Sequence, residues 1–211
     1  MTSLLHVSAS PRGAASESLA LASTFLATYR EMHPDAIVDT LDLWEAPLPR
    51  FGPAGASAKV AVFGGAGPDS LDPEQAAVWA QAQALAGQFT AAGAYLFSVP
   101  MWNAGVPYVL KQWIDIITQP GMLFGFDPAT GYTGLVTGKK AAAIYTSGVY
   151  APGVPIEYGT DFHSSFLTDW LRFAGVTDVT EIRFQPTILT PTPAEDRATA
   201  HTAARNAAKV F

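Results

Sequence analysis

Short apolar runs alternate along this chain with segments in which apolar residues recur at every third or fourth position. The runs predict five strands, at residues 4–7, 37–43, 94–99, 141–146 and 176–184. The intervening segments have helical spacing and predict helices from near residue 16, at 72–92, 106–117 and 164–174, and from 192 to about 210. This alternation indicates a parallel sheet covered by helices on both faces.

Two segments interrupt the alternation. Residues 44–71 hold several Pro and Gly residues and are expected to be irregular, whereas residues 119–137 are expected to form a hairpin-like excursion. Capping sequences at 72–75 and 192–195 mark two helix starts. No repeat or linker divides the chain, so residues 1–211 are expected to form a single domain.

Composition narrows the class of protein. The chain is 49% hydrophobic and 14% charged, below the usual charged share of about 25%, which fits extensive buried surface. A net charge of -6 without any Lys or Arg run argues against nucleic acid and membrane surfaces as partners. The absence of Cys excludes disulfides and thiolate chemistry. No apolar run approaches the roughly 20 residues that span a bilayer, and the N-terminus lacks a signal-peptide pattern, so a soluble, cytoplasmic protein is expected.

Candidate chemistry lies first in the loop after the first predicted strand. The next helix begins near residue 16, and a helix N-terminus offers free N–H groups and a positive dipole end to a phosphate. The residues predicted to bind the ligand there are Ser10, Arg12, Ser16, Glu17 and Ser18, of which the three serines are predicted to hold its phosphate. The alternative for this loop on its own is that Ser16 only caps the helix and Ser10 only sits in a turn.

The loops after the third and fourth strands extend this candidate site. The first of them combines a thioether, an indole and an amide, which suit the edge of a flat, partly polar ring, and the second is small enough for its backbone to approach such a ring. The residues predicted to hold the ring are Met101, Trp102, Asn103, Ala104, Thr146, Ser147, Gly148 and Val149. For Met101 and Trp102, packing in the core is the alternative.

These three loops meet at one edge of the sheet if the strand order is 2-1-3-4-5, with the switch point between the first and third strands. The expected fold is a flavodoxin-like three-layer sandwich with a five-stranded parallel sheet. A phosphate beside a flat ring predicts FMN. A dinucleotide fingerprint is missing, because Gly65 and Gly67 have no third glycine at position 70, and residues 134–140 lack the spacing of a phosphate loop.

With these loops placed, the chain resembles the FMN-dependent NADH:quinone oxidoreductases, also called azoreductases, over nearly its whole length. The matching stretches are residues 100–103, the helix at 110–111, 134–141 and 175–178, and residues 16–18 fit the family's Ser-x-Ser phosphate cradle. The resemblance implies a homodimer with one FMN per subunit near the interface. It also implies a ping-pong cycle in which a hydride passes from NADH or NADPH to the flavin and then to quinones or azo compounds, whose azo bond is reductively cleaved.

The chain departs from the family pattern in two of the loops. The family usually reads Met-Tyr-Asn-Phe after the third strand, where this chain has Trp102 and Ala104 in place of the two aromatics. After the fourth strand the family usually carries Arg and paired glycines, where this chain reads Gly148, Val149 and Tyr150. FMN binding remains the expectation, whereas the acceptor and the choice between NADH and NADPH stay open.

Since the flavin carries the chemistry, no catalytic side chain and no metal are expected. Phe124, Phe126 and Tyr150 are predicted to line the substrate site, and packing within the hairpin is an equal alternative for the two phenylalanines. His163 is the one histidine placed near a plausible mouth, where it would be able to donate a proton, although a lone histidine is more often structural. Lys111 and Asp115, four residues apart on a helix, are expected to form a solvated pair.

Other classes of protein remain as alternatives. An electron-transfer flavodoxin without small-molecule turnover would need a strongly acidic docking face, and a net charge of -6 is modest. A flavin-binding or flavin-free regulatory module of the same fold is the second alternative. A serine hydrolase is disfavoured, because the chain has no G-x-S-x-G nucleophile elbow.

Overall fold

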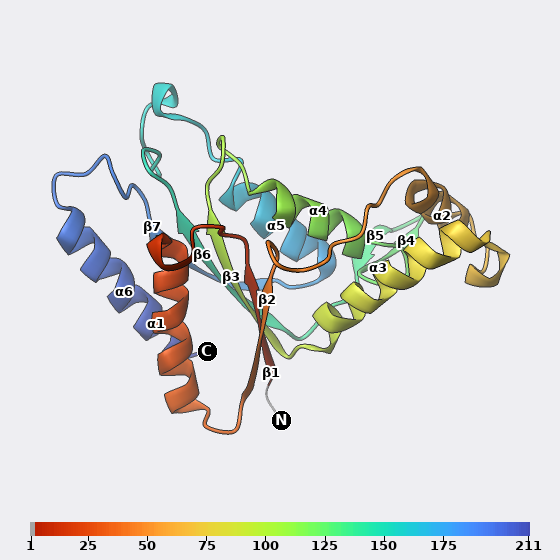
Figure 1. Cartoon of the computed structure of the whole chain (residues 1–211), viewed down its shortest axis with the longest axis horizontal. Helices are drawn as coiled ribbons and strands as arrows, with labels where there is room; N and C mark the ends of the chain where they lie inside the picture. Colours follow the sequence, from red (N-terminus) through yellow and green to blue (C-terminus); the bar gives the residue numbers. More distant parts are fainter. Residues whose placement is uncertain (1–2) are drawn as a thin grey trace.

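Five parallel strands form the central sheet of the computed structural model, which describes residues 3–211 (Figure 1). Residues 1–2, part of the expected single domain, lie outside the described residues. The strands are β1 (Ser3–Ser8), β2 (Ile37–Asp42), β3 (Ala94–Pro100), β6 (Lys140–Thr146) and β7 (Asp178–Phe184). Their spatial order is β2-β1-β3-β6-β7. Counted along the sheet strands alone this is the order 2-1-3-4-5, so the expected flavodoxin-like topology is confirmed.

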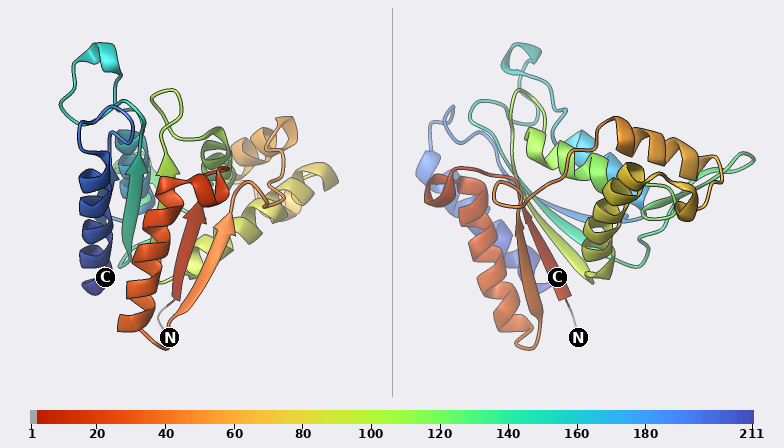
Figure 2. Two further views of the ribbon diagram at one scale, coloured as in Figure 1. Left: turned by 60° about the vertical axis from the view of Figure 1, so that its left-hand side comes forward. Right: turned by 45° about the vertical axis from the view of Figure 1, so that its right-hand side comes forward.

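Helices cover both faces of the sheet, because the strands expose apolar side chains on both. The helices α1 (Glu17–Met32) and α6 (Pro193–Lys209) lie side by side on one face (Figure 2). The opposite face carries α3 (Pro73–Ala91), α4 (Tyr108–Ile117) and α5 (Ser164–Ala174). Along β1, Leu5 and Val7 join the core under α3–α5, while Leu4 joins the core under α1 and α6. Double-sided burial explains why the strands read as continuous apolar runs.

The segment 44–71 corrects an expectation. It holds the helix α2 (Pro53–Phe63) and a short 3-10 turn (Pro68–Ser70), whereas the sequence predicted irregular structure. Pro53 occupies the first helical turn, where its missing N–H costs nothing. Ala58 is fully buried, and α2 packs against α3. The Pro and Gly residues that suggested a loop therefore lie in or beside a helix that tertiary packing stabilises.

Two smaller differences concern element ends. The last strand begins at Asp178 and not at residue 176, because Val176 closes the end of α5, where its N–H donates to the Leu171 carbonyl. Thr192 precedes α6 and its carbonyl accepts the Asp196 N–H at 2.9 Å, but its side chain accepts no N–H bond from the helix, so the predicted side-chain cap is not formed. The capping box at Asp72 and Gln75 is confirmed, with both reciprocal bonds formed.

The expected hairpin within 119–137 is confirmed as β4 (Phe124–Asp127) paired antiparallel with β5 (Gly131–Gly134). Its end meets the C-terminus of α5, where the Val136 N–H donates to the Ala174 carbonyl at 2.8 Å. A Cβ on Gly134 would lie 2.3 Å from the Gly175 nitrogen. Two stretches that carry the family resemblance, 134–141 and 175–178, thus touch at a point where only glycine fits.

Among the described residues, none of the helices combines the length and the apolar character that crossing a membrane requires.

Candidate functional site

Three loops converge at the carboxyl edge of the sheet, as the strand order predicts. The register pairs Ser8 of β1 with Ser98 of β3, and Pro100 of β3 with Thr146 of β6, so the three strands end beside one another. Between the loops lies a cavity of about 210 Å³, called here the loop cavity. It is lined by Ser10, Arg12, Ser16, Glu17, Pro100, Met101, Trp102, Thr146, Ser147, Gly148, Thr187 and Ile188.

The phosphate end of this site is built on the N-terminus of α1. The Ser16 hydroxyl accepts the Leu19 N–H at 3.2 Å and lies 3.1 Å from the hydroxyl of the fully buried Ser18. Ser16 is therefore the helix cap, as the structural alternative held. The N–H groups of Glu17 and Ser18 lie in the first helical turn, where the intrahelical ladder supplies no acceptor.

Two further observations show that this end fits an anion. The hydroxyl of Ser10 is buried and has no hydrogen-bond partner among residues 3–211. The exposed guanidinium of Arg12 lines the same cavity. The Glu17 carboxylate turns away to α6, where it accepts the Arg197 Nε–H at 2.8 Å. The donors present, hydroxyl, backbone N–H and guanidinium, match a phosphate group.

The loop after β3 is a tight turn with two residues in the left-handed conformation. Trp102 and Gly105 exchange both backbone hydrogen bonds at 2.9 Å, and Asn103 and Ala104 between them have φ of 48° and 68°. Positive φ at both central residues is the pattern of a type I′ turn, which costs a residue such as alanine about 1–2 kcal/mol. The Met101 N–H is fixed on the Thr146 carbonyl at 2.7 Å. Strain of this kind at a cavity wall is typical of ligand sites.

The loop after β6 is held by a segment that sequence reasoning missed. The carbonyls of Ser147 and Gly148 accept the N–H groups of Thr187 and Ile188 at 2.8 and 2.9 Å. A Cβ on Gly148 would lie 3.1 Å from the Ile188 side chain. The signal was available, because residues 185–187 end the last predicted strand at the same sheet edge.

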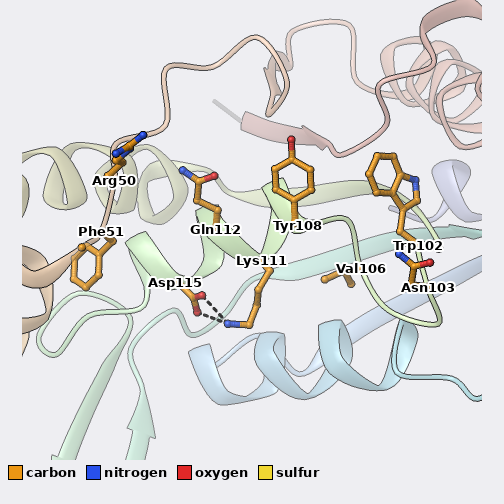
Figure 3. Close-up of a pocket in the computed structure, with 10 residues that line it drawn as sticks. Arg50, Phe51, Trp102, Asn103, Val106, Tyr108, Lys111, Gln112 and Asp115 are labelled. Atoms are coloured by element: carbon orange, nitrogen blue, oxygen red, sulfur yellow. Dashed lines mark hydrogen bonds and ion pairs between the residues drawn. The ribbon is translucent and has the colours of Figure 1, made fainter.

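The remaining predicted ring residues lie around the loop cavity. Trp102 is partly exposed and packs against Trp44 and Tyr108, with ring centroids 5.5 and 6.3 Å away. Its side chain therefore packs against aromatic neighbours and also belongs to a residue that lines the loop cavity. Asn103 lines an adjoining cavity of about 700 Å³ (Figure 3). Ala104 and Val149 belong to the same two loops but do not line the loop cavity.

The adjoining cavity is a second feature that the sequence did not reveal. Figure 3 shows Arg50 and Phe51, from the segment before α2, on one side and residues of α4 on the other. The remaining lining residues are Gly52, Trp102, Asn103, Val106, Tyr108, Lys111, Gln112 and Asp115. Lys111 and Asp115 form the expected exposed pair at 2.6 Å.

The predicted substrate residues are not gathered at the loop cavity. Phe124 is buried against Tyr132 and Phe173, an arrangement that favours the hairpin-packing alternative within one chain. Phe126 is exposed and packs against Phe63 and Tyr132. Tyr150 is half-buried, and burial, with the nearby Asp161 charge, raises its pKa. None of the three lines either cavity.

His163 is placed as the structural reading has it, in the core and away from both cavities. Its ring is fully buried against Tyr145, 4.9 Å away, and burial lowers its pKa to about 4 although the Asp161 charge opposes this. His6 of β1 is also buried, its ring bonded to the Ser98 hydroxyl, and burial lowers its pKa to about 4 as well. Both rings are neutral near pH 7. Within residues 3–211, no three His, Asp or Glu side chains are grouped to hold a metal.

Both buried histidines predict a pH-dependent stability. A lowered folded-state pKa means that the unfolded chain binds more protons between pH 4 and 6.5, so stability is lost as the pH falls through that window. We expect the free energy of unfolding to fall by about 1.4 kcal/mol per pH unit for each histidine. Urea unfolding at several pH values measures this, and His163→Gln should remove about half of the slope. A flat profile from pH 6.5 to 5 would contradict it.

Comparisons with known proteins find relatives over the length of the chain. A family model described as a flavodoxin-like fold matches residues 2–208. A protein of Ruegeria pomeroyi named FMN-dependent NADH:quinone oxidoreductase is 47% identical over 193 residues, covering 92% of this chain and 93% of the relative. A protein of Burkholderia lata named FMN-dependent NADH:quinone oxidoreductase 9 is 39% identical over 216 residues and covers all of both chains. The crystal structure of azoreductase from Bacillus anthracis str. Sterne superposes with a TM-score of 0.89 at 29% identity over 100% of both chains.

Proposed function

Because this chain belongs to the family of FMN-dependent NADH:quinone oxidoreductases with the flavodoxin-like fold, we propose that it transfers a hydride from NADH or NADPH to quinones and to azo compounds in a ping-pong reaction. The observation that carries the proposal is the loop cavity, where a helix N-terminus, an unpartnered buried hydroxyl and the residues that open the strained turn, Met101 and Trp102, face one space. The relatives named above carry enzyme names, which favours an enzyme over a carrier protein or a regulatory module.

Different residues would hold the phosphate and the ring of FMN. Ser10, Ser16 and the N–H groups that open α1 would bind the phosphate, with Arg12 balancing its charge. The turn at 101–105 and the loop at 146–149 would hold the ring. Bound FMN supplies the redox chemistry, since it takes up and releases a hydride.

The chain's own contribution is position and environment. Trp44, Trp102 and Tyr108 form a packed aromatic group beside the turn, and such a surface favours flat substrates. Among the described residues, His163 is not suited to donate a proton there, because its ring is neutral near pH 7 and enclosed. We therefore expect an acceptor to take its proton from solvent and not from a side chain.

We propose further that two copies form a homodimer with FMN near the interface. Exposed apolar side chains support this, because they gather in the loops that follow the sheet edge and would gain from being covered. They are Val149, Ile156, Tyr158, Phe162, Ile188 and Leu189. The use of a nicotinamide donor favours the cytoplasm as its compartment.

The first experiment is an absorption spectrum of the purified protein, before and after anaerobic addition of NADH or NADPH. A flavin band that bleaches with donor and returns with a quinone is the expected result. A band indifferent to both nicotinamides would indicate a carrier, and no band after incubation with FMN would contradict the flavin site. Light scattering on the same sample should give twice the chain mass of 22.3 kDa.

A further inference from the structure

The turn at 102–105 is held from outside by one hydrogen bond. The carbonyl of Ala104, a residue with φ of 68°, accepts the N–H of Phe162 at 3.0 Å. Phe162 lies in the segment that leads into α5, almost sixty positions further along the chain, and its own side chain is exposed. The strained turn therefore depends on how the backbone at Phe162 is oriented.

That backbone is fixed by the side chain of Asp161. Its Oδ1 accepts the N–H groups of His163 and Ser164 at 3.0 and 2.7 Å, and its Oδ2 accepts the Ser164 hydroxyl. These bonds close a loop around Phe162, so the peptide groups on either side of it cannot rotate independently. The Phe162 N–H, which the Thr160 carbonyl also accepts at 3.2 Å, is thus held toward the closer Ala104 carbonyl by the carboxylate of the preceding residue.

Arg183 of β7 holds the carboxylate in place. Its Nη1 lies 3.7 Å from Asp161 Oδ2, and its Nη2 donates to the Ser164 hydroxyl at 2.8 Å. The guanidinium lies 5.0 Å from the centre of the Tyr145 ring, and Glu181 accepts from it at 2.6 Å. Both members of the Asp161–Arg183 pair are mostly buried, so their interaction is screened less than that of a surface pair.

The state of Asp161 fits this role. Burial alone would raise the pKa of its carboxyl, but hydrogen bonds from Ser164 and His163 and the Arg183 charge outweigh burial and leave that pKa below its usual value. The carboxylate is therefore ionised and accepts hydrogen bonds at neutral pH. Beneath it, the buried His163 ring packs against Tyr145 and anchors the start of α5 to the sheet.

We propose that Asp161, oriented by Arg183, is a positioning residue for the turn at 102–105, whose flavin-facing geometry it sets through the Phe162 N–H and the Ala104 carbonyl. The role rests on the proposed function, because the turn matters to ligand binding only if it holds the flavin. Asp161 touches neither cavity wall itself, and it acts through the backbone of another loop.

Affinity of the apoprotein for FMN, followed by quenching of flavin fluorescence, tests this role without turnover. We expect Asp161→Ala to weaken FMN binding about tenfold, and Asp161→Asn, which keeps a capping oxygen, to recover most of the loss. Ala104→Gly removes the conformational strain, since glycine accepts positive φ freely. Adding it to Asp161→Ala should therefore restore FMN affinity to within about threefold of wild type.

Asp169→Ala is the matched control, because Asp169 lies on the same α5 in an exposed pair with Arg172. It should bind FMN like wild type. Wild-type FMN affinity in Asp161→Ala would overturn the positioning role. So would an equal loss of affinity in Asp161→Ala and in Asp161→Ala combined with Ala104→Gly, because that result would indicate general damage to α5. A wild-type apoprotein that binds no FMN would instead overturn the flavin site itself, and the role with it.

Discussion

Replacing Ser16 and Ser18 together by alanine is expected to weaken FMN binding about 30- to 100-fold. Ser16 and Ser18 have hydroxyls 3.1 Å apart at the N-terminus of α1, and Ser16 lines the loop cavity. A hydrogen bond to a charged group contributes about 1.5–3 kcal/mol, so loss of the pair should cost about 2–3 kcal/mol of binding free energy. The measurement is the FMN dissociation constant of the apoprotein.

The cap role of Ser16 must be separated from phosphate binding. Ser16→Asp keeps a capping oxygen for the Leu19 N–H but places a negative charge where the phosphate would lie. It should therefore preserve the melting temperature of the apoprotein while abolishing most FMN binding. Ser23→Ala, at an exposed position of the same helix, should change neither. If the double alanine variant and Ser16→Asp both bound FMN with wild-type affinity, the phosphate would have to bind elsewhere.

Replacing Gly134 by alanine is expected to be the most destabilising of the glycine-to-alanine changes at the described glycines. The new Cβ would lie 2.3 Å from the Gly175 nitrogen and 2.5 Å from the Ala174 carbonyl carbon, both backbone atoms that cannot move aside alone. Forced separation of the hairpin from the end of α5 should cost about 3 kcal/mol or more, which lowers the melting temperature by roughly 6–12 °C.

Gly87→Ala provides a control of opposite sign. Gly87 lies within α3, and a Cβ there would have no neighbour within 4 Å. Alanine is favoured over glycine in a helix by about 0.5–1 kcal/mol, so this variant should melt slightly higher than wild type. If Gly134→Ala matched wild type in a thermal melt, the close approach of the two loops would be wrong.

The layered fold followed from local patterns. The five apolar runs became the five sheet strands, because strands buried on both faces must be apolar at successive positions. The capping box at Asp72 also formed, since it requires only neighbours along the chain. The helix α2 was missed because its Pro and Gly flanks dominate a window average, while its stability comes from packing on α3.

Strand order predicts which loops, and therefore which residues, meet at the candidate site. Ser10, Ser16, Met101, Trp102, Thr146, Ser147 and Gly148 line one cavity because three neighbouring strands end together. For Phe124 the sequence leaves packing and substrate contact as equal alternatives, because position in a loop does not determine which way a side chain turns. Thr187 and Ile188 were overlooked although the same sheet-edge argument applied to them.

By itself the amino-acid sequence determined the element order, the parallel sheet and the loops that meet at its edge, since these follow from periodicity and from the geometry of β-α-β connections. Only the tertiary structure decided which distant groups touch: Gly134 with Gly175, Phe162 with Ala104, and Asp161 with Arg183. The physical reason is that such contacts depend on the packing of whole elements, and no local run of residues encodes the partner of a hydrogen bond that lies far away along the chain.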